Sequence, residues 1–209
     1  MMFMDYGAGE FATKIWFPRY FAYCRRNVEN TLAFSLSSLP TPPSLPNFGI
    51  PSGSGVLGMA ACKLDSSARA IGVDIDVDAV HIANANAETN HVDMNNYLSD
   101  LVQTTGDDES TSIRLKAYSS KDGQECETLP DRLNGPIYDA LVANILAQPL
   151  VSLAPTLSTL VKPGALLGLS GIMTSQSGMV QAAYEDYFDD IKVEKELLGW
   201  VLITGTRKE

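Results

Sequence analysis

Short apolar runs alternate with helical patterns along most of the chain, and this alternation constrains its fold more than any other feature. Three segments have the length and composition of buried strands: 69–75 (RAIGVDI), 138–143 (YDALVA) and the centre of 162–171 (KPGALLGLSG). Helical patterns lie between and around them, at 56–64, 77–90, 148–161 and 175–187. Such alternation predicts an α/β fold with a mostly parallel, doubly wound sheet. The pattern at 190–208 predicts a terminal hairpin that adds an antiparallel strand.

Prolines locate the first strand of this predicted sheet. Five of them make a central strand across 40–51 unfavourable, because proline cannot donate to a strand ladder: Pro40, Pro42, Pro43, Pro46 and Pro51. TLAFSL at 31–36 is therefore the best candidate, and SIRLKAY at 112–118 alternates as a further strand. We divide the single predicted domain into a linker-like segment with a first helix (1–30), an irregular Pro/Ser-rich stretch (31–51) and the main α/β unit (52–209).

Composition excludes several classes of function. The net charge of −10 comes without an evident basic patch, so we expect no nucleic-acid partner. No apolar run approaches the roughly 18 residues of a membrane span, and the two histidines have no cysteine nearby that would suggest a metal site. The three cysteines form no CxxC pair, which favours a reducing compartment. We expect a cytoplasmic monomer, with an organelle left open if the N-terminus is incomplete.

A glycine-rich turn precedes the helical pattern at 56–64. GSGVLG at Gly53–Gly58 matches G-x-G-x-x-G, and Asp74 ends the next apolar run, 21 residues after Gly53. Two cofactor classes use this layout, NAD(P) and S-adenosylmethionine, because both bring backbone amides close to a ligand and use an acid to accept ribose hydroxyls. Gly53, Gly55 and Asp74 are therefore candidate cofactor residues. For Asp76 and Asp78 we favour helix capping and support of the helix dipole.

An asparagine ends the apolar run YDALVA. Ligands of open α/β sheets bind beyond the carboxyl ends of the strands, so Asn144 should lie near the glycine turn. An amide there can orient an amine for methyl transfer, although capping or turn formation explains an asparagine equally well. The alternative of an NAD(P) oxidoreductase is weakened because no tyrosine has a lysine four residues later, as one large dehydrogenase class requires.

Longer strings make one family resemblance specific. The segment DALVANILAQPLVSLAPTLSTLVKPGALLGLSGI at 139–172 resembles the ribosomal protein L11 methyltransferase family of the bacterial PrmA type. The glycine turn, the acidic loop, MDYGAGEFATK at 4–14 and GWVLITGTRK at 199–208 resemble further parts of that family. The resemblance implies a Rossmann-like, seven-stranded class I methyltransferase fold that uses S-adenosylmethionine to methylate lysine and N-terminal amines of a ribosomal or related protein.

By position, the resemblance also implies roles for individual residues. Asp74 would bind the ribose, and Asn144 would act as a catalytic and cofactor-site residue. Lys14 stands where the family has the threonine that contacts the cofactor, so Thr13 would make that contact only with a shift of the upstream segment. The resemblance begins at the family's linker, so we expect the small N-terminal substrate-recognition domain to be lacking. Pro51 stands where the family has the first glycine of its turn, and proline removes a backbone donor. A truncated methyltransferase-like protein with weak or no activity is the remaining alternative.

Overall fold

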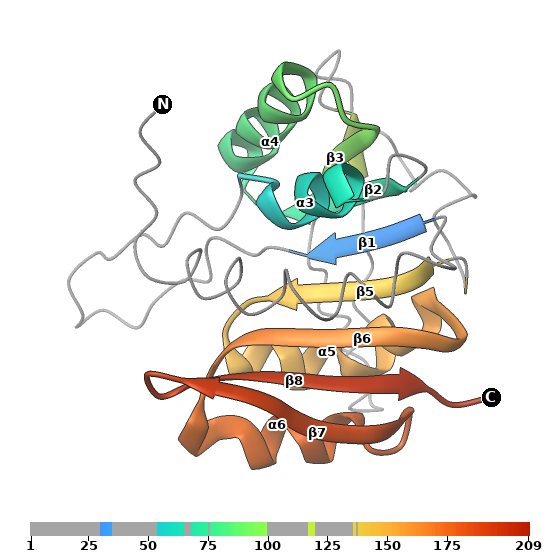
Figure 1. The fold of residues 1–209 in the computed structure, drawn as a ribbon, viewed down its shortest axis with the longest axis vertical. Helices are drawn as coiled ribbons and strands as arrows, with labels where there is room; N and C mark the ends of the chain where they lie inside the picture. Colours follow the sequence, from blue (N-terminus) through green and yellow to red (C-terminus); the bar gives the residue numbers. More distant parts are fainter. Residues whose placement is uncertain are drawn as a thin grey trace, which may run out of the picture.

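The structure is a computed structural model that describes residues 30–34, 54–64, 68–74, 76–99, 117–119, 136 and 138–209. Within these ranges an eight-stranded sheet has the order β4-β3-β2-β1-β5-β6-β8-β7 (Figure 1). The strands are β1 (Asn30–Phe34), β2 (Arg69–Asp74), β3 (Met94–Ser99), β4 (Ala117–Ser119), β5 (Tyr138–Asn144), β6 (Val161–Met173), β7 (Phe188–Leu197) and β8 (Trp200–Arg207). The helices are α3 (Val56–Leu64), α4 (Val77–Thr89), α5 (Ala147–Leu160), α6 (Ser177–Tyr184) and the short 3₁₀ helix η2 (Thr174–Gln176).

The sheet is parallel at its centre and antiparallel at both edges. Strands β3, β2, β1, β5 and β6 run in one direction, and β8 pairs antiparallel with β6 and with β7. The terminal hairpin and the strands predicted at 69–75 and 138–143 are confirmed. The strand predicted at 31–36 is also confirmed: it is β1, the strand between β2 and β5.

One strand was missed, and another was predicted over a longer span. Strand β3 carries Asn95 and Asn96, and two adjacent polar residues conceal a buried strand from a hydrophobic pattern. Asn96 is nevertheless buried, and its backbone N–H and side-chain amide both donate to Asn84 Oδ1 of α4 at 3.0 Å. The expected strand at 112–118 appears only as the short β4, which pairs antiparallel with β3; residues 112–116 lie outside the described ranges.

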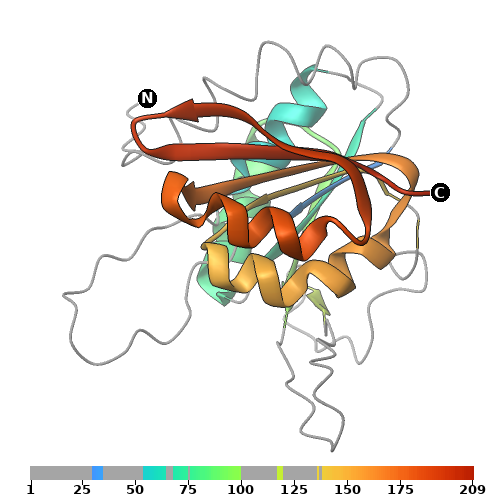
Figure 2. The ribbon, with the colours of Figure 1, turned by 90° about the horizontal axis from the view of Figure 1, so that it is seen from below.

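Helices cover the two faces of the sheet in separate pairs. The right-handed crossovers from β1 to β2 and from β5 to β6 lead in opposite directions across the sheet, so their helices lie on opposite faces. In Figure 1, α5 lies behind β6, whereas α3 lies in front of β2. Figure 2 shows α5 and α6 side by side beneath the sheet. The carboxyl ends of the central strands are thereby left at one edge, between the two helical layers.

The main core lies between the sheet and the pair α5 and α6. Its fully buried side chains include Leu141 of β5, Leu169 of β6 and Leu157 of α5. The hydroxyl of Tyr184 in α6 donates to the Leu150 carbonyl of α5 at 3.0 Å, and burial raises the pKa of this tyrosine well above its ordinary value. This hydrogen bond joins the two helices inside an otherwise apolar layer.

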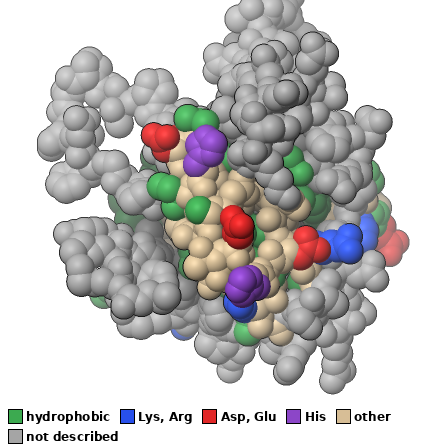
Figure 3. All heavy atoms as spheres, turned by 90° about the horizontal axis from the view of Figure 1, so that it is seen from above, with side chains coloured by type: hydrophobic (Ala, Val, Ile, Leu, Met, Phe, Trp, Pro, Cys, Tyr) green, Lys and Arg blue, Asp and Glu red, His purple; other side chains and the backbone are tan. Residues whose placement is uncertain are grey.

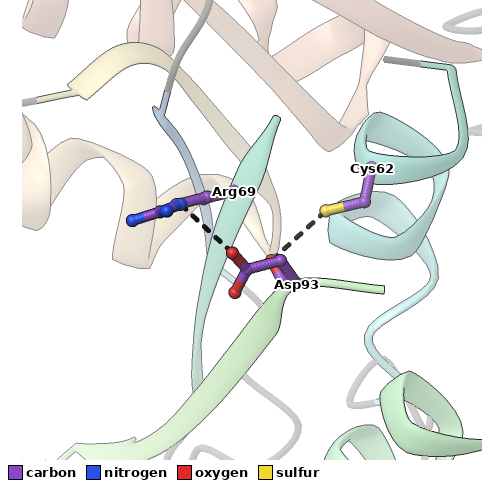
Figure 4. A network of polar contacts seen from close by, with 3 residues as sticks. All are labelled: Cys62, Arg69 and Asp93. Atoms are coloured by element: carbon purple, nitrogen blue, oxygen red, sulfur yellow. Dashed lines mark hydrogen bonds and ion pairs between the residues drawn. The ribbon is translucent and has the colours of Figure 1, made fainter. Parts of the chain in front are cut away.

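A smaller core lies beneath α3 and α4. Cys62 of α3 packs there with Ala70, Ala87 and Met94, and its Sγ lies 3.5 Å from the Asp93 carbonyl oxygen (Figure 4). The Asp93 carboxylate pairs with exposed Arg69 at 3.1 Å. Burial, and secondarily the negative charge of Asp93, raise the pKa of the Cys62 thiol to about 11. Cys62 is therefore a neutral core residue at physiological pH.

Candidate functional site

The carboxyl edge of the sheet brings the two principal predicted residues to the same level. Phe34, the last residue of β1, pairs with Val73 on one side and with Ala143 on the other. Asp74 and Asn144 each follow those partners by one residue, so they flank the end of β1 on neighbouring strands. Two interstrand spacings separate their strands, which is about 10 Å. This separation suits one ligand that lies across the end of β1.

Asp74 is held at the tip of β2 by the start of α4. Asp74 is 4% exposed, and its Oδ1 accepts a hydrogen bond from the Asp76 backbone N–H at 3.0 Å. Asp76 is the N-cap of α4, because its own Oδ1 accepts from the Asp78 N–H at 2.9 Å. The capping role predicted for Asp76 is confirmed, and Asp78 lies in the first turn of α4 as expected. A buried carboxylate fixed in this way can act as an oriented acceptor for ligand hydroxyls.

The described part of the glycine turn has the backbone that glycine permits. Gly55 has φ +75°, and an added Cβ would lie 3.1 Å from the Ala83 Cβ of α4. The side chain of Asn86, also in α4, donates to the Ser54 carbonyl at 3.0 Å and ties the turn to that helix. Gly58 allows α3 to approach β3, since a Cβ there would lie 2.6 Å from Met94 Cε. Gly53 and Thr13, the other predicted cofactor residues, lie outside the described residues.

Asn144 is half-exposed at the end of β5. The N-cap of α5 is Leu146, without a side-chain hydrogen bond, so the alternative that Asn144 caps this helix is wrong. Directly after Asn144, the Ile145 N–H donates to the Ser170 carbonyl at 3.1 Å, so the pairing with β6 extends one residue beyond β5. The amide of Asn144 is therefore presented at the strand edge by two paired strands.

Gly171 belongs to this site and was not among the predicted residues. It has φ +83°, and an added Cβ would lie 3.0 Å from Asn144 Oδ1 and 2.5 Å from the Ile145 carbonyl oxygen. Any side chain at this position would therefore displace the asparagine amide or the β5 backbone. Gly171 lies within the segment 139–172 that resembles the family, and a glycine in a strand interior is itself a signal of close backbone approach.

Chemically, the edge offers a carboxylate, a tight glycine turn and a side-chain amide. The first two fit a nucleoside cofactor, and the amide can hold a second reactant beside it. Figure 3, which views the molecule from above Figure 1, shows the two histidines apart from each other on this surface. Among the described residues, no three His, Cys, Asp or Glu side chains are grouped in a way that could hold a metal ion.

Comparison with known proteins decides the family. The sequence model described as "Ribosomal protein L11 methyltransferase (PrmA)" matches residues 47–208. The chain belongs to the PrmA family. Two similar relatives are the ribosomal protein L11 methyltransferases of Pseudomonas aeruginosa and Salmonella arizonae, which are 41% and 43% identical over 157 residues. The family resemblance predicted from the sequence is confirmed.

The matched segment is only part of these PrmA relatives. It covers 75% of this chain but 43% of the Pseudomonas protein and 43% of the Salmonella protein. The chain thus spans less than half the length of the curated relatives it matches. The activity and partners of the whole relatives are therefore matters for proposal in this chain.

Solved structures show that the PrmA-family chain has an α/β methyltransferase fold. A ribosomal protein L11 methylase from Lactobacillus delbrueckii subsp. bulgaricus superposes with a TM-score of 0.59 at 21% identity, covering 90% of this chain and 75% of that one. A methyltransferase from Pyrococcus furiosus superposes with a TM-score of 0.59 at 12% identity, covering 96% and 94%. In the described ranges, none of the helices has the length and apolar character needed to cross a membrane.

Proposed function

We propose that the chain is an S-adenosylmethionine-dependent protein methyltransferase that acts on lysine and N-terminal amines of ribosomal protein L11 or a related protein. The observation that carries this proposal is the match to the PrmA family over 47–208, which includes both Asp74 and Asn144. The register of β1 with its two neighbours supports it, because Asp74 and Asn144 flank one strand end. A cofactor and an acceptor amine can meet there.

The described residues fit the cofactor. Asp74 would accept the ribose hydroxyls, and the turn at Gly55 would bring backbone close to the ligand without a Cβ in the way. Gly53 and Thr13 complete the cofactor residues that we assign from the family pattern. When bound, S-adenosylmethionine supplies a methyl group on a sulfonium, which is open to attack by a nucleophile. The chain itself contributes binding and orientation.

Asn144 would orient the acceptor amine. A free lysine has a pKa of about 10.4, and the ammonium form has no lone pair, so the amine must first lose a proton to solvent or to a carboxylate. The oxygen of the Asn144 amide can then accept an N–H of the neutral amine, which fixes the direction of its lone pair. Gly171 keeps the space beside this oxygen clear of any side chain.

The finer assignments follow from the same family pattern. We infer that β3, β2, β1, β5, β6, β8 and β7 are the seven strands of the class I methyltransferase sheet, and that β4 is an addition at its edge. We also infer a methyltransferase unit at 52–209, preceded by the linker-like segment and the Pro/Ser-rich stretch. A cytoplasmic monomer with a protein substrate is consistent with this assignment.

Two measurements test the proposed function. Calorimetric titration should detect S-adenosylhomocysteine binding and no NADH binding; NADH binding without the former would favour the oxidoreductase alternative. Methyl transfer to purified ribosomal protein L11 should then label lysine or N-terminal amines, as read by mass spectrometry. Binding of neither ligand, together with no methyl transfer, would reject the proposed function in favour of the inactive, truncated alternative.

A further inference from the structure

Among the described residues of the sheet, two buried hydroxyls have no hydrogen-bond partner. Ser170 of β6 and Thr204 of β8 are each 1% exposed, and neither Ser170 Oγ nor Thr204 Oγ1 makes a hydrogen bond. A buried hydroxyl without a partner costs free energy, because it loses its hydrogen bonds to water on folding. Each such group in a folded protein needs an explanation. The position of Ser170 supplies one.

Ser170 is the register partner of Asn144 on the adjacent parallel strand. Paired residues of parallel strands project to the same face, with about 5 Å between the strands. The flanking residues Ala143, Ile145, Leu169 and Ile172 all belong to the core beneath α5 and α6. Because side chains alternate along a strand, Asn144 and Ser170 both project to the other face, the one that carries α3 and α4.

The backbone of β6 has an irregularity next to Asn144. The pairing of β6 with β8 shifts register between Leu169 and Ile172, which marks a bulge at Ser170 and Gly171. At Gly171 the absent side chain leaves room for Asn144 Oδ1, which would lie only 3.0 Å from an added Cβ. Bulges near active sites commonly re-aim a side chain. Ser170 Oγ makes no hydrogen bond in this structure, so donation to Asn144 requires a change in the side-chain torsion angles of the two residues.

We propose that Ser170 is a positioning residue for Asn144, donating its hydroxyl hydrogen to Asn144 Oδ1 when an acceptor amine is bound. This inference rests on the proposed function. An amide oxygen has two lone pairs, so one can accept from Ser170 while the other accepts from the amine. When it donates, the hydroxyl stabilises the amide orientation that keeps the oxygen of Asn144 at the reaction site. Without it, the amide can turn its NH₂ group toward the amine, and two donors then face each other.

The test compares Ser170→Ala with Thr204→Val, which removes a second buried, unpartnered hydroxyl of the described residues, one strand further from Asn144. Neither substitution breaks a hydrogen bond, so neither should lower the thermal unfolding midpoint by more than about 2 °C. Ser170→Ala should lower kcat about 5- to 10-fold with unchanged affinity for S-adenosylhomocysteine, and Thr204→Val should leave both at wild-type values. In the Asn144→Ala background, Ser170→Ala should cause no further loss, because the two residues act as a unit. Equal kcat in Ser170→Ala and wild type, or a fully additive loss, would overturn the proposal.

A second readout does not depend on turnover. The side-chain amide resonance of Asn144 is identified by its absence from the spectrum of Asn144→Ala. With S-adenosylhomocysteine present, n-butylamine serves as a mimic of the lysine side chain. Its addition should shift that resonance in wild type and Thr204→Val, and shift it less in Ser170→Ala. If wild type transfers no methyl group, the proposed function fails, and this titration alone decides the positioning role. Equal shifts in all three proteins, or no shift in any of them, would overturn it.

Discussion

At the scale of the residue, Asn144 is the side chain on which the proposed chemistry depends. It contributes orientation rather than a proton or a covalent bond. Asn144→Ala should therefore lower turnover about 10²- to 10³-fold, comparable to the loss of one preorganised donor in other enzymes. Affinity for S-adenosylhomocysteine should fall much less, because in the proposed site the cofactor would also contact Asp74 and the glycine turn. Paired calorimetry and methyl-transfer assays measure the two effects; equal losses in both would make Asn144 a cofactor-retention residue.

Asp74 should show the opposite pattern. It is a buried carboxylate fixed by the Asp76 N–H. In the proposed site its removal would take away charged hydrogen bonds to the ribose rather than contacts with the amine. Asp74→Ala should weaken S-adenosylhomocysteine binding by about 1.5–3 kcal/mol, the range for hydrogen bonds to charged groups. Asp78→Ala is the matched control, since Asp78 is exposed in the first turn of α4. An unchanged dissociation constant in a folded Asp74→Ala protein would remove Asp74 from the site.

Sequence patterns located Asp74 and Asn144 but not Gly171 or Ser170, for a physical reason. Both predicted residues break an apolar run at its end, where a polar side chain is conspicuous. Gly171 and Ser170 owe their importance to a shift of register between β6 and β8, and register is set by pairing with a strand that follows thirty residues later. Residues at a bulge are therefore recognised only once the strands are paired.

At the scale of the element, local sequence signals predicted β1 and α4 but not β3. Prolines restricted the first strand to 31–36, and Asp76 identified the start of α4, because both act within a few residues of the chain. Strand β3 has no such local marker. Its Asn96 is buried through hydrogen bonds to Asn84, twelve residues earlier on α4, and only the assembled layer satisfies that amide. Proline and capping patterns therefore predicted β1 and α4, whereas β3 depends on contacts that form only in the folded protein.

The end of α4 carries a local conflict that a substitution can relieve. The His91 N–H donates to the Glu88 carbonyl and the Val92 N–H to the Ala87 carbonyl, the two bonds of a Schellman motif. His91 thereby occupies the left-handed position with φ 51°, which glycine adopts without strain. His91→Gly should raise the free energy of unfolding by about 0.5–1 kcal/mol, as measured by urea denaturation. His91→Ala keeps the Cβ and should bring no such gain; equal stabilisation by both would exclude backbone strain as the cause.

At the scale of the whole molecule, the direction of the crossovers explains why one edge holds the site. The chain leaves β1 toward β2 and β3, and later builds β5, β6, β8 and β7 on the other side. The order of the strands therefore reverses at β1. Because the crossover helices on the two sides lie on opposite faces of the sheet, a crevice is left at the end of β1. Asp74 comes from one half and Asn144 from the other. The proposed cofactor binding and amine orientation would therefore require both halves to be folded together.

The stability of the whole molecule should also depend on alkaline pH through Cys62. Its folded-state pKa of about 11 exceeds the value of 9.0 for a free thiol, because burial disfavours the thiolate. Between these values the unfolded chain loses the thiol proton and the folded chain keeps it, so the unfolded chain binds fewer protons. The free energy of unfolding should then fall as pH rises from about 9 to 11, by at most about 2–3 kcal/mol from this group, and the contribution is fully present below pH 9.

Urea denaturation of wild type and Cys62→Ala across this pH range isolates the effect. Other groups, including Tyr184, titrate in both proteins and cancel in the difference. The stability of wild type relative to Cys62→Ala should therefore be constant below pH 9 and decline above it. A difference that stays flat to pH 11 would mean that the thiol ionises as readily in the folded layer beneath α3 as in water, and that this layer admits solvent. A decline would show instead that the apolar layer beneath α3 excludes water. The glycine turn at the start of that helix would then be packed against a well-ordered core.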